Sequence, residues 1–172
     1  MGLCFSKRLT LFVLSVLSVL VFSASIIQAT EISGTISSTL TIMENSELVG
    51  DVTCVVVGAP CISFGTSGIK LRLNGFTITG SDTDCRAATA STFGIVVTGQ
   101  QNVAILGPGL VQKFAVFGVA LNGANKVRVE GVTASDNCFS GIFLAGTTDS
   151  DIEKNISVRN SIDSKGNPCG GT

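Results

Sequence analysis

The stretch Gly118–Asn137 reads GVALNGANKVRVEGVTASDN, and its pattern decides the fold. It holds three short apolar runs, each broken by Gly or Asn. Runs of this length, rich in β-branched residues and bounded by turn-forming residues, are typical of short β-strands. No stretch after Ala29 has convincing helical periodicity, so the sequence predicts an all-β fold.

The same pattern recurs on both sides of that stretch. GIVVTGQQNVAIL starts at Gly94, GVALNGANKVRV at Gly118 and GIFLAGTTDSDI at Gly141, so the units follow one another at a nearly constant spacing. A unit this short cannot bury its apolar face alone and must stack on copies of itself. Each strand then pairs in parallel with the equivalent strand one turn on, roughly 4.8 Å away. The repeat therefore predicts a right-handed parallel β-helix, a solenoid with turns of about 23 residues.

Alternation within each strand predicts which side chains face the interior. The expected inward positions are Ile95 and Val97, Val119 and Leu121, Ile142 and Leu144 in the first strands, and Val103 and Ile105, Val127 and Val129, and Ile152 in the second. Asn137 and Asn160 are separated by one repeat and lie at a turn. We expect their side chains to stack in a hydrogen-bonded ladder.

The segment from Met1 to Ala29 has the three-part layout of a secretory signal peptide. Lys7 and Arg8 give a basic start, the apolar run LTLFVLSVLSVLVF follows, and small residues precede an expected cleavage after Ala29. The uncharged run from Leu9 to Ala29 is long enough to span a bilayer of roughly 30 Å, so an uncleaved membrane anchor is the alternative. The leader predicts a secreted, periplasmic or cell-surface protein, with membrane contact only if it stays uncleaved.

The remainder of the chain is expected to divide into two parts. Residues 30–68 would form an N-terminal cap and the first turn, and residues 69–172 the repeats, which open with IKLRLNGFTITG. The polar segment between Gly80 and Gly94 is expected to loop out. The last residues, NSIDSKGNPCGGT, hold no obvious capping segment, so the solenoid is either closed by something supplied elsewhere or truncated from a longer array.

Charge and cysteine content limit the partners and the compartment. Without residues 1–29 the chain keeps all 12 Asp and Glu and 9 of the 11 Lys and Arg, a net charge of −3. This weak acidic balance gives no electrostatic reason to expect nucleic acid as a partner. Five cysteines remain, and export would place them where disulfides persist. Cys54 with Cys61 would close a short loop and Cys138 with Cys169 would tie one turn to the next, but the spacing leaves other pairings open.

Several motifs together resemble the right-handed parallel β-helix repeat proteins. They are LRLNGFTITG, the recurring GI-x-L-x-G followed by N/K-V-x-I/V, and the SDNCFSGI connector. This pectate-lyase-like superfamily also contains the repeats of a periplasmic copper-enzyme maturation protein. The likeness covers about residues 69–160, and ISSTLTIMENSELVGDVTC is similar to the lead-in these proteins often carry, although Phe76 stands where their opening motif often has His. The resemblance implies the fold, while the group's roles range over polysaccharide lyases, epimerases and surface proteins, so function is argued from sites.

The residue types present exclude several chemistries. The chain has no histidine, which removes His-based acid–base catalysis, a Ser-His-Asp triad and most zinc or copper sites. Its cysteines form no C-x-x-C pair, so disulfides are expected rather than a metal cage. Gly107-Pro108-Gly109 has no helix after it and is expected to be a solenoid corner rather than a phosphate loop. No cofactor is expected.

Charged residues on the outward side of the second strand are the main candidate for a site. An offset of one repeat places Lys126 beside Asp149, Arg128 beside Asp151, and Glu130 beside Glu153. Two neighbouring carboxylates repel, which would raise one pKa and create a shared proton or a Ca²⁺ site. The resemblance adds that polysaccharide lyases of this architecture place carboxylates on a solvent-facing sheet, usually with Ca²⁺ and a basic proton acceptor, a role open to Arg128. The alternative is that Lys154 and Lys126 screen the pair.

An apolar stripe is expected on the outward side of the first strand. It consists of Val96, Ala120 and Phe143, none of which can act as an acid, base or nucleophile. An exposed stripe of this kind marks a binding or packing surface, and the alternative is that the segment from Ser81 to Phe93 covers it. The chain has neither Trp nor Tyr, so Phe143 alone would be a thin platform for a sugar ring.

These features predict an exported, non-enzymatic β-helix that presents a long flat face to a polysaccharide or a surface protein. The alternative is a polysaccharide lyase or related carbohydrate-active enzyme, complete or as a fragment, that uses Glu130 and Glu153 with Arg128 and binds Ca²⁺.

Overall fold

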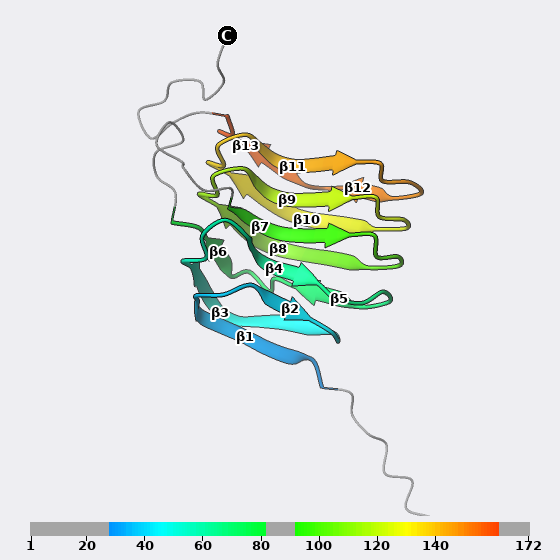
Figure 1. Cartoon of the computed structure of the whole chain (residues 1–172), viewed down its shortest axis with the longest axis horizontal. Helices are drawn as coiled ribbons and strands as arrows, with labels where there is room; N and C mark the ends of the chain where they lie inside the picture. Colours follow the sequence, from blue (N-terminus) through cyan, green and yellow to red (C-terminus); the bar gives the residue numbers. More distant parts are fainter. Residues whose placement is uncertain (1–27, 82–91, 162–172) are drawn as a thin grey trace, which may run out of the picture.

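The structure is a computed structural model that describes residues 28–81 and 92–161 (Figure 1). Within these two ranges all regular elements are β-strands, and there is no helix. The predicted all-β class is therefore confirmed. The predicted signal peptide, apart from its last two residues, most of the segment expected to loop out, and the end of the chain from residue 162 lie outside the described residues.

Sheet A, the larger of two parallel sheets, has the strand order β1-β3-β5-β8-β10-β12. Two short strands lie off this path: β6 pairs with β3 and β8, and β13 pairs with β10. The bounds are β1 Thr30–Ile36, β3 Ser46–Cys54, β5 Lys70–Arg72, β6 Thr77–Thr79, β8 Ala104–Gln112, β10 Arg128–Ser135, β12 Asp151–Glu153 and β13 Ile156–Val158.

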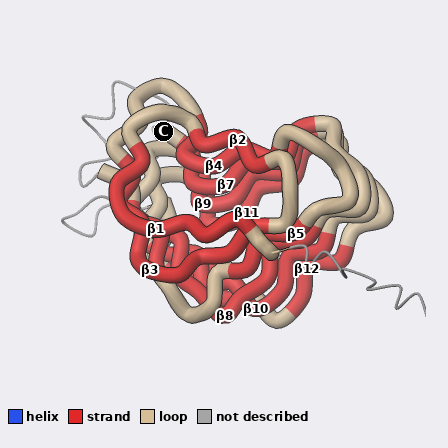
Figure 2. Tube along the Cα trace, turned by 90° about the horizontal axis from the view of Figure 1, so that it is seen from below, coloured by secondary structure: helices blue, strands red, loops and turns tan. Residues whose placement is uncertain are grey.

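Sheet B has the order β11-β9-β7-β4-β2, and all its pairs are also parallel. The bounds are β2 Leu40–Ile42, β4 Pro60–Phe64, β7 Phe93–Thr98, β9 Phe117–Asn122 and β11 Ser140–Ala145. The chain alternates between the two sheets, so strands that neighbour each other in a sheet come from successive turns. Figure 2 shows these turns lying nearly over one another.

The strand register has the period that the sequence predicts. Val129 pairs with Ile105 of the preceding turn and with Ile152 of the following turn, one repeat away on either side. The offset between Leu71 and Ile105 is longer than one repeat, because residues 82–91 fall between them. Stacked parallel strands in two sheets with this period are compatible with a β-solenoid.

The core lies between the two sheets and includes most of the predicted inward residues. Those before the last turn are all buried: Ile95, Val97, Val103, Ile105, Val119, Leu121, Val127 and Val129. The last described turn differs, because Leu144 is 44% and Ile152 36% exposed. Among the described residues no further strand stacks on that turn, so its inward side chains have neighbours on one side only.

Asparagine side chains tie the corners of successive turns together. Asn137 is fully buried, its Oδ1 accepts a hydrogen bond from the backbone of Phe114 at 3.2 Å, and its Nδ2 donates to the carbonyl of Val111 at 3.3 Å. Asn137 Nδ2 also donates to Asn160 Oδ1 at 3.0 Å, which confirms the predicted ladder. The ladder satisfies backbone groups that the corner would otherwise bury without partners.

Disulfides reinforce the first and later turns. Cys54 at the end of β3 is bonded to Cys61 in β4, which confirms the short loop considered from the sequence. Cys138 is buried and also disulfide-bonded. Its considered partner Cys169 lies outside the described residues.

Candidate binding surface on sheet A

The outward face of sheet A carries the charged ladders that the sequence predicts. Arg128 pairs in register with Asp151, and Glu130 with Glu153. Asn125 and Thr148, directly before the predicted pair of Lys126 and Asp149, form a bridge with the same offset of one repeat. Glu130 and Glu153 therefore do lie on adjacent strands, on the same face.

Two cations fill the space around these two carboxylates. Arg128 Nη2 lies 2.6 Å from Glu130 Oε2 and 3.2 Å from Glu153 Oε1. Lys154 Nζ lies 2.6 Å from Glu130 Oε1 and 3.9 Å from Glu153 Oε2. We call Arg128, Glu130, Glu153 and Lys154 the charge quartet. It is balanced, with two positive and two negative groups.

The quartet keeps Glu130 ionised. The hydrogen bond from Lys154 lowers the pKa of Glu130 against some desolvation, and the positive charges of Arg128 and Lys154 add to this. The same bond and the charge of Glu130 raise the pKa of Lys154. The expectation that repulsion raises a carboxylate pKa and creates a shared proton is wrong for Glu130, because a cation lies against each of its oxygens.

The arrangement also fits Ca²⁺ poorly. Ca²⁺ takes six to eight oxygen ligands, and a site needs carboxylates whose oxygens are free to point at the ion. Here Glu130 directs both oxygens at cations, and Glu153 lies within ion-pair distance of the same two cations. No group of three or more His, Cys, Asp or Glu side chains suited to a metal occurs within residues 28–81 and 92–161.

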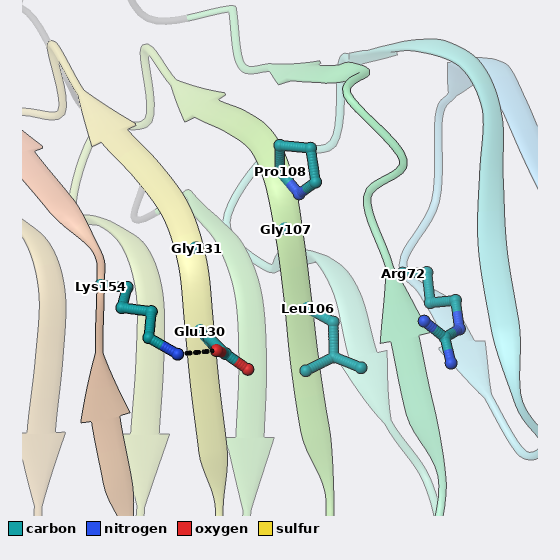
Figure 3. A pocket seen from close by; sticks show the side chains of 7 residues that line it. All are labelled: Arg72, Leu106, Gly107, Pro108, Glu130, Gly131 and Lys154. Carbon is teal, nitrogen blue, oxygen red and sulfur yellow. Dashed lines mark hydrogen bonds and ion pairs between the residues drawn. The ribbon is translucent and has the colours of Figure 1, made fainter.

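Beside the quartet the face is hollowed by an open depression of about 400 Å³ (Figure 3). It crosses four neighbouring strands of sheet A. The lining residues are Arg72 at the end of β5, Leu106, Gly107 and Pro108 in β8, Glu130 and Gly131 in β10, and Lys154 directly after β12. Figure 3 shows Arg72 on one side of Leu106, with the bonded pair of Glu130 and Lys154 on the other.

The shape of the depression follows from glycines where β8 bends. The register between β8 and β10 shifts between Glu130 and Val132, opposite Gly107 and Pro108. A Cβ on Gly107 would overlap the carbonyl of Gly131, and Gly131 itself has a φ of +69°. Gly107-Pro108-Gly109 is thus part of a bent strand, rather than the corner between strands that the sequence suggested.

Arg72 is the residue of this surface that sequence reasoning missed. It is exposed and makes no ion pair with any described residue, unlike Arg128. Its register partner is Leu106, and Leu106 in turn pairs with Glu130. The longer offset across residues 82–91 hides this relation, because a search at the regular repeat spacing aligns Arg72 with nothing in β8. The motif LRLNGFTITG contains Arg72, but it does not predict which residues of other strands lie beside Arg72.

The predicted apolar stripe on sheet B is not a free surface. Val96, Ala120 and Phe143 are in register, as expected. However, Val96 is only 7% and Ala120 0% exposed, so the prediction of a free surface is wrong and the stripe is covered, as in the alternative considered from the sequence. Most of the segment considered as the cover, residues 82–91, lies outside the described residues.

Neighbouring aromatic rings are one physical reason for the burial of Ala120. Phe143, its register partner, stacks on Phe117 with ring centroids 4.2 Å apart. Phe117 also contacts Phe93 at 5.9 Å, so Phe143 belongs to an aromatic row.

Comparison with known proteins found no relative of this chain. No protein-family model matches the chain, and searches of curated proteins and of solved structures found no similar protein. Among the described residues no helix is long and apolar enough to cross a membrane.

Proposed function

We propose that this chain is an exported, non-enzymatic right-handed parallel β-helix that binds an extended polysaccharide along sheet A. The depression beside the charge quartet is the observation that carries the proposal. It crosses four neighbouring strands, so its length runs along the stack of turns. An extended polymer lying in it would contact several turns at once.

The chemistry of the lining suits a sugar chain. Leu106 and Pro108 provide an apolar floor for the C–H faces of sugar rings, while Arg72 and Lys154 provide hydrogen-bond donors at either side. Binding sites typically combine an apolar lining with a few placed polar groups of this kind. Glu130 lies between them and, being ionised, acts as an acceptor for sugar hydroxyls.

The proposed export is supported by the disulfides and by the leader. Cys54, Cys61 and Cys138 are disulfide-bonded, and such bonds persist in oxidising compartments. Residues 1–29 have the composition of a secretory signal peptide. We therefore infer a secreted, periplasmic or cell-surface protein.

The geometry favours binding over the lyase alternative. A lyase of the kind considered would need Arg128 as a proton acceptor and two carboxylates available to Ca²⁺. Arg128 is held between Glu130 and Glu153, so its guanidinium group is already engaged by two carboxylates. Arg128 and Glu153 are thus engaged within the quartet, and only Glu130 and Lys154 of its four members also line the depression.

The test is retardation of the purified protein in gels that contain neutral or acidic polysaccharides, with Arg72→Ala and Leu106→Ala as variants. Loss of a charged hydrogen-bonding group costs about 1.5–3 kcal/mol, so Arg72→Ala should weaken binding at least about tenfold. Lys126→Ala is the matched control, because Lys126 is an exposed cation outside the depression. Binding that is unchanged in Arg72→Ala and in Leu106→Ala, or the absence of binding to any polysaccharide, would refute the proposal. Release of unsaturated uronides, seen as ultraviolet absorbance, would favour the lyase instead.

A further inference from the structure

The outward face of sheet A has two cations beside an uncharged strip. In β8 the outward residues Ala104 and Leu106 carry no charge. Their register partners in β5 are Lys70 and Arg72, which we call the β5 cations. Both β5 cations face outward, because Leu71 between them is fully buried, and roughly 6.6 Å separates their positions along the strand. The β5 side of the depression is therefore positively charged.

Neither of the β5 cations forms an ion pair with any residue in the ranges 28–81 and 92–161. Glu47 of β3 is the register partner of Arg72 on the side away from β8, yet it bonds elsewhere. Asn74 Nδ2 donates to Glu47 Oε2 at 3.2 Å and to the carbonyl of Leu48 at 3.1 Å. Asn74 has a φ of +50° and Gly75 one of +86°, so a tight turn after β5 brings this amide over β3. The turn holds Glu47 out of ion-pair contact and leaves the guanidinium of Arg72 available to a ligand.

The cations on the opposite side of the depression are already paired. Lys154 Nζ lies 2.6 Å from Glu130 Oε1, as Figure 3 shows. Arg128 lies 2.6 Å from the other oxygen of Glu130 and 3.2 Å from Glu153. Their charge is balanced within the quartet, whereas that of the β5 cations is not. A ligand with acidic groups would therefore gain most by turning these groups toward β5.

We propose that the β5 cations make this surface selective for acidic polysaccharides, whose carboxylate or sulfate groups they bind directly, without a metal ion. This inference rests on the proposed function and names the class of its ligand. A guanidinium presents paired N–H donors that match two oxygens of such a group, and a lysine adds a compact positive charge. Without residues 1–29 the protein has a net charge of −3, which disfavours general attraction to polyanions. Selectivity must then come from a local group of cations.

Calorimetric titration of the protein, secreted by a host that removes any leader, with three derivatives of one extended backbone tests this selectivity. Hydroxyethyl cellulose is neutral, carboxymethyl cellulose carries carboxylates, and cellulose sulfate carries sulfate esters. The wild type should bind at least one of the two acidic polymers at least about tenfold more tightly than the neutral one, because hydrogen bonds to charged groups are the stronger kind. High salt should reduce this preference, and chelation of metal ions with EDTA should leave it intact.

Two variants test the β5 cations themselves. Lys70→Gln removes one positive charge without changing a residue that lines the depression, and should lower the preference for the acidic polymer about threefold. Glu47→Gln removes the carboxylate beside Arg72 and should raise the preference about twofold. Lys126→Gln is the matched control, because Lys126 is an exposed cation outside the depression, and should keep the wild-type preference.

The outcomes separate this inference from the proposed function. Equal affinity for the three polymers, a preference that Lys70→Gln leaves unchanged, or binding that is lost in EDTA would each overturn the inference while polysaccharide binding stands. A preference lost in Lys126→Gln would also overturn it, because the charge of the whole protein would then select the ligand. Absence of binding to every polysaccharide would refute both.

Discussion

Single asparagine side chains fasten one turn of this protein to the next. Asn137 bonds to Phe114 and Val111, and Asn155 repeats the scheme by accepting from Val132 and donating to Val129, each bond at 2.8 Å. The spacing in sequence between the asparagine and each of its two partners is the same in both cases. A corner asparagine therefore satisfies one backbone donor and one backbone acceptor of the preceding turn.

Replacing Asn137 by alanine should cost about 2–4 kcal/mol of unfolding free energy, because it leaves the buried N–H of Phe114 and the carbonyl of Val111 without this partner. Urea denaturation followed by circular dichroism measures the loss. Asn125→Ala is the control, since the side chain of Asn125 donates only to the exposed side chains of Thr148 and Asp149 and its loss should cost about 0.5 kcal/mol. Equal losses in the two variants would show that burial of the ladder does not matter.

At the scale of elements, the bend shared by β8 and β10 shapes the depression. Gly107 and Gly131 lie so close that a side chain on the former would meet the backbone of the latter. The bend separates the half of β8 that continues β5 from the half that continues β6. The position of Pro108 on the surface therefore depends on a backbone contact between adjacent strands.

Gly107→Ala should destabilise the protein by about 3 kcal/mol, since the clash is with backbone that cannot rotate away. Thermal unfolding of the variant measures the effect. The comparison is Gly99→Ala, where φ is +72° but no atom lies within 4 Å of the added Cβ, so that only backbone strain of about 1 kcal/mol applies. A Gly107→Ala protein as stable as Gly99→Ala would contradict the close approach.

The charge quartet, which links β10 to β12, predicts a dependence of stability on pH. The folded-state pKa of Glu130 is lowered, so its contribution is fully present above the ordinary glutamate pKa and disappears as the pH falls through the lowered value. The pKa of Lys154 is raised, so its contribution is lost only as the pH rises through that raised value. Between these limits the quartet's contribution to stability should be constant.

Urea denaturation of wild type and Glu130→Gln, repeated from neutral to acidic pH, tests this dependence. The wild type should be the more stable at neutral pH, and the difference should shrink as the pH falls below the ordinary glutamate range. High salt should reduce the difference at neutral pH, because the pair is exposed. A difference that grows on acidification would mean that the sign of the pKa shift is wrong.

The molecule as a whole is a stack whose turns differ in the number of neighbours. Strands β8 and β10 are paired on both sides, while β11, β12 and β13 are paired on one side only within residues 28–81 and 92–161. In repeat architectures stability is close to a sum of contributions from each turn and its neighbours. The last described turn should therefore open more readily than the middle of the stack.

Hydrogen exchange measured by mass spectrometry should reveal this gradient. Peptides that cover β8 and β10 should be the most protected, and peptides that cover β11 to β13 the least. Uniform protection along the chain would indicate that the stack opens as a single unit.

The sequence by itself determined the all-β class, the spacing of the turns, the inward positions and the pairing of Glu130 with Glu153. These properties follow from two periods, the alternation of side chains along a strand and the repeat of about 23 residues along the stack, and both can be read without knowing any neighbour. The Asn137 and Asn160 ladder followed for the same reason.

Only the tertiary structure decided which side chains from different turns approach one another. Lys154 reaches Glu130 from beyond the end of β12, which lowers a pKa that the carboxylate pair alone would have raised. Arg72 enters the same surface across a turn of irregular length, and the Phe117 and Phe143 rings stack beside Ala120. Periodicity fixes where a residue stands on its strand, but its exposure and its charge state depend on side chains from adjacent turns.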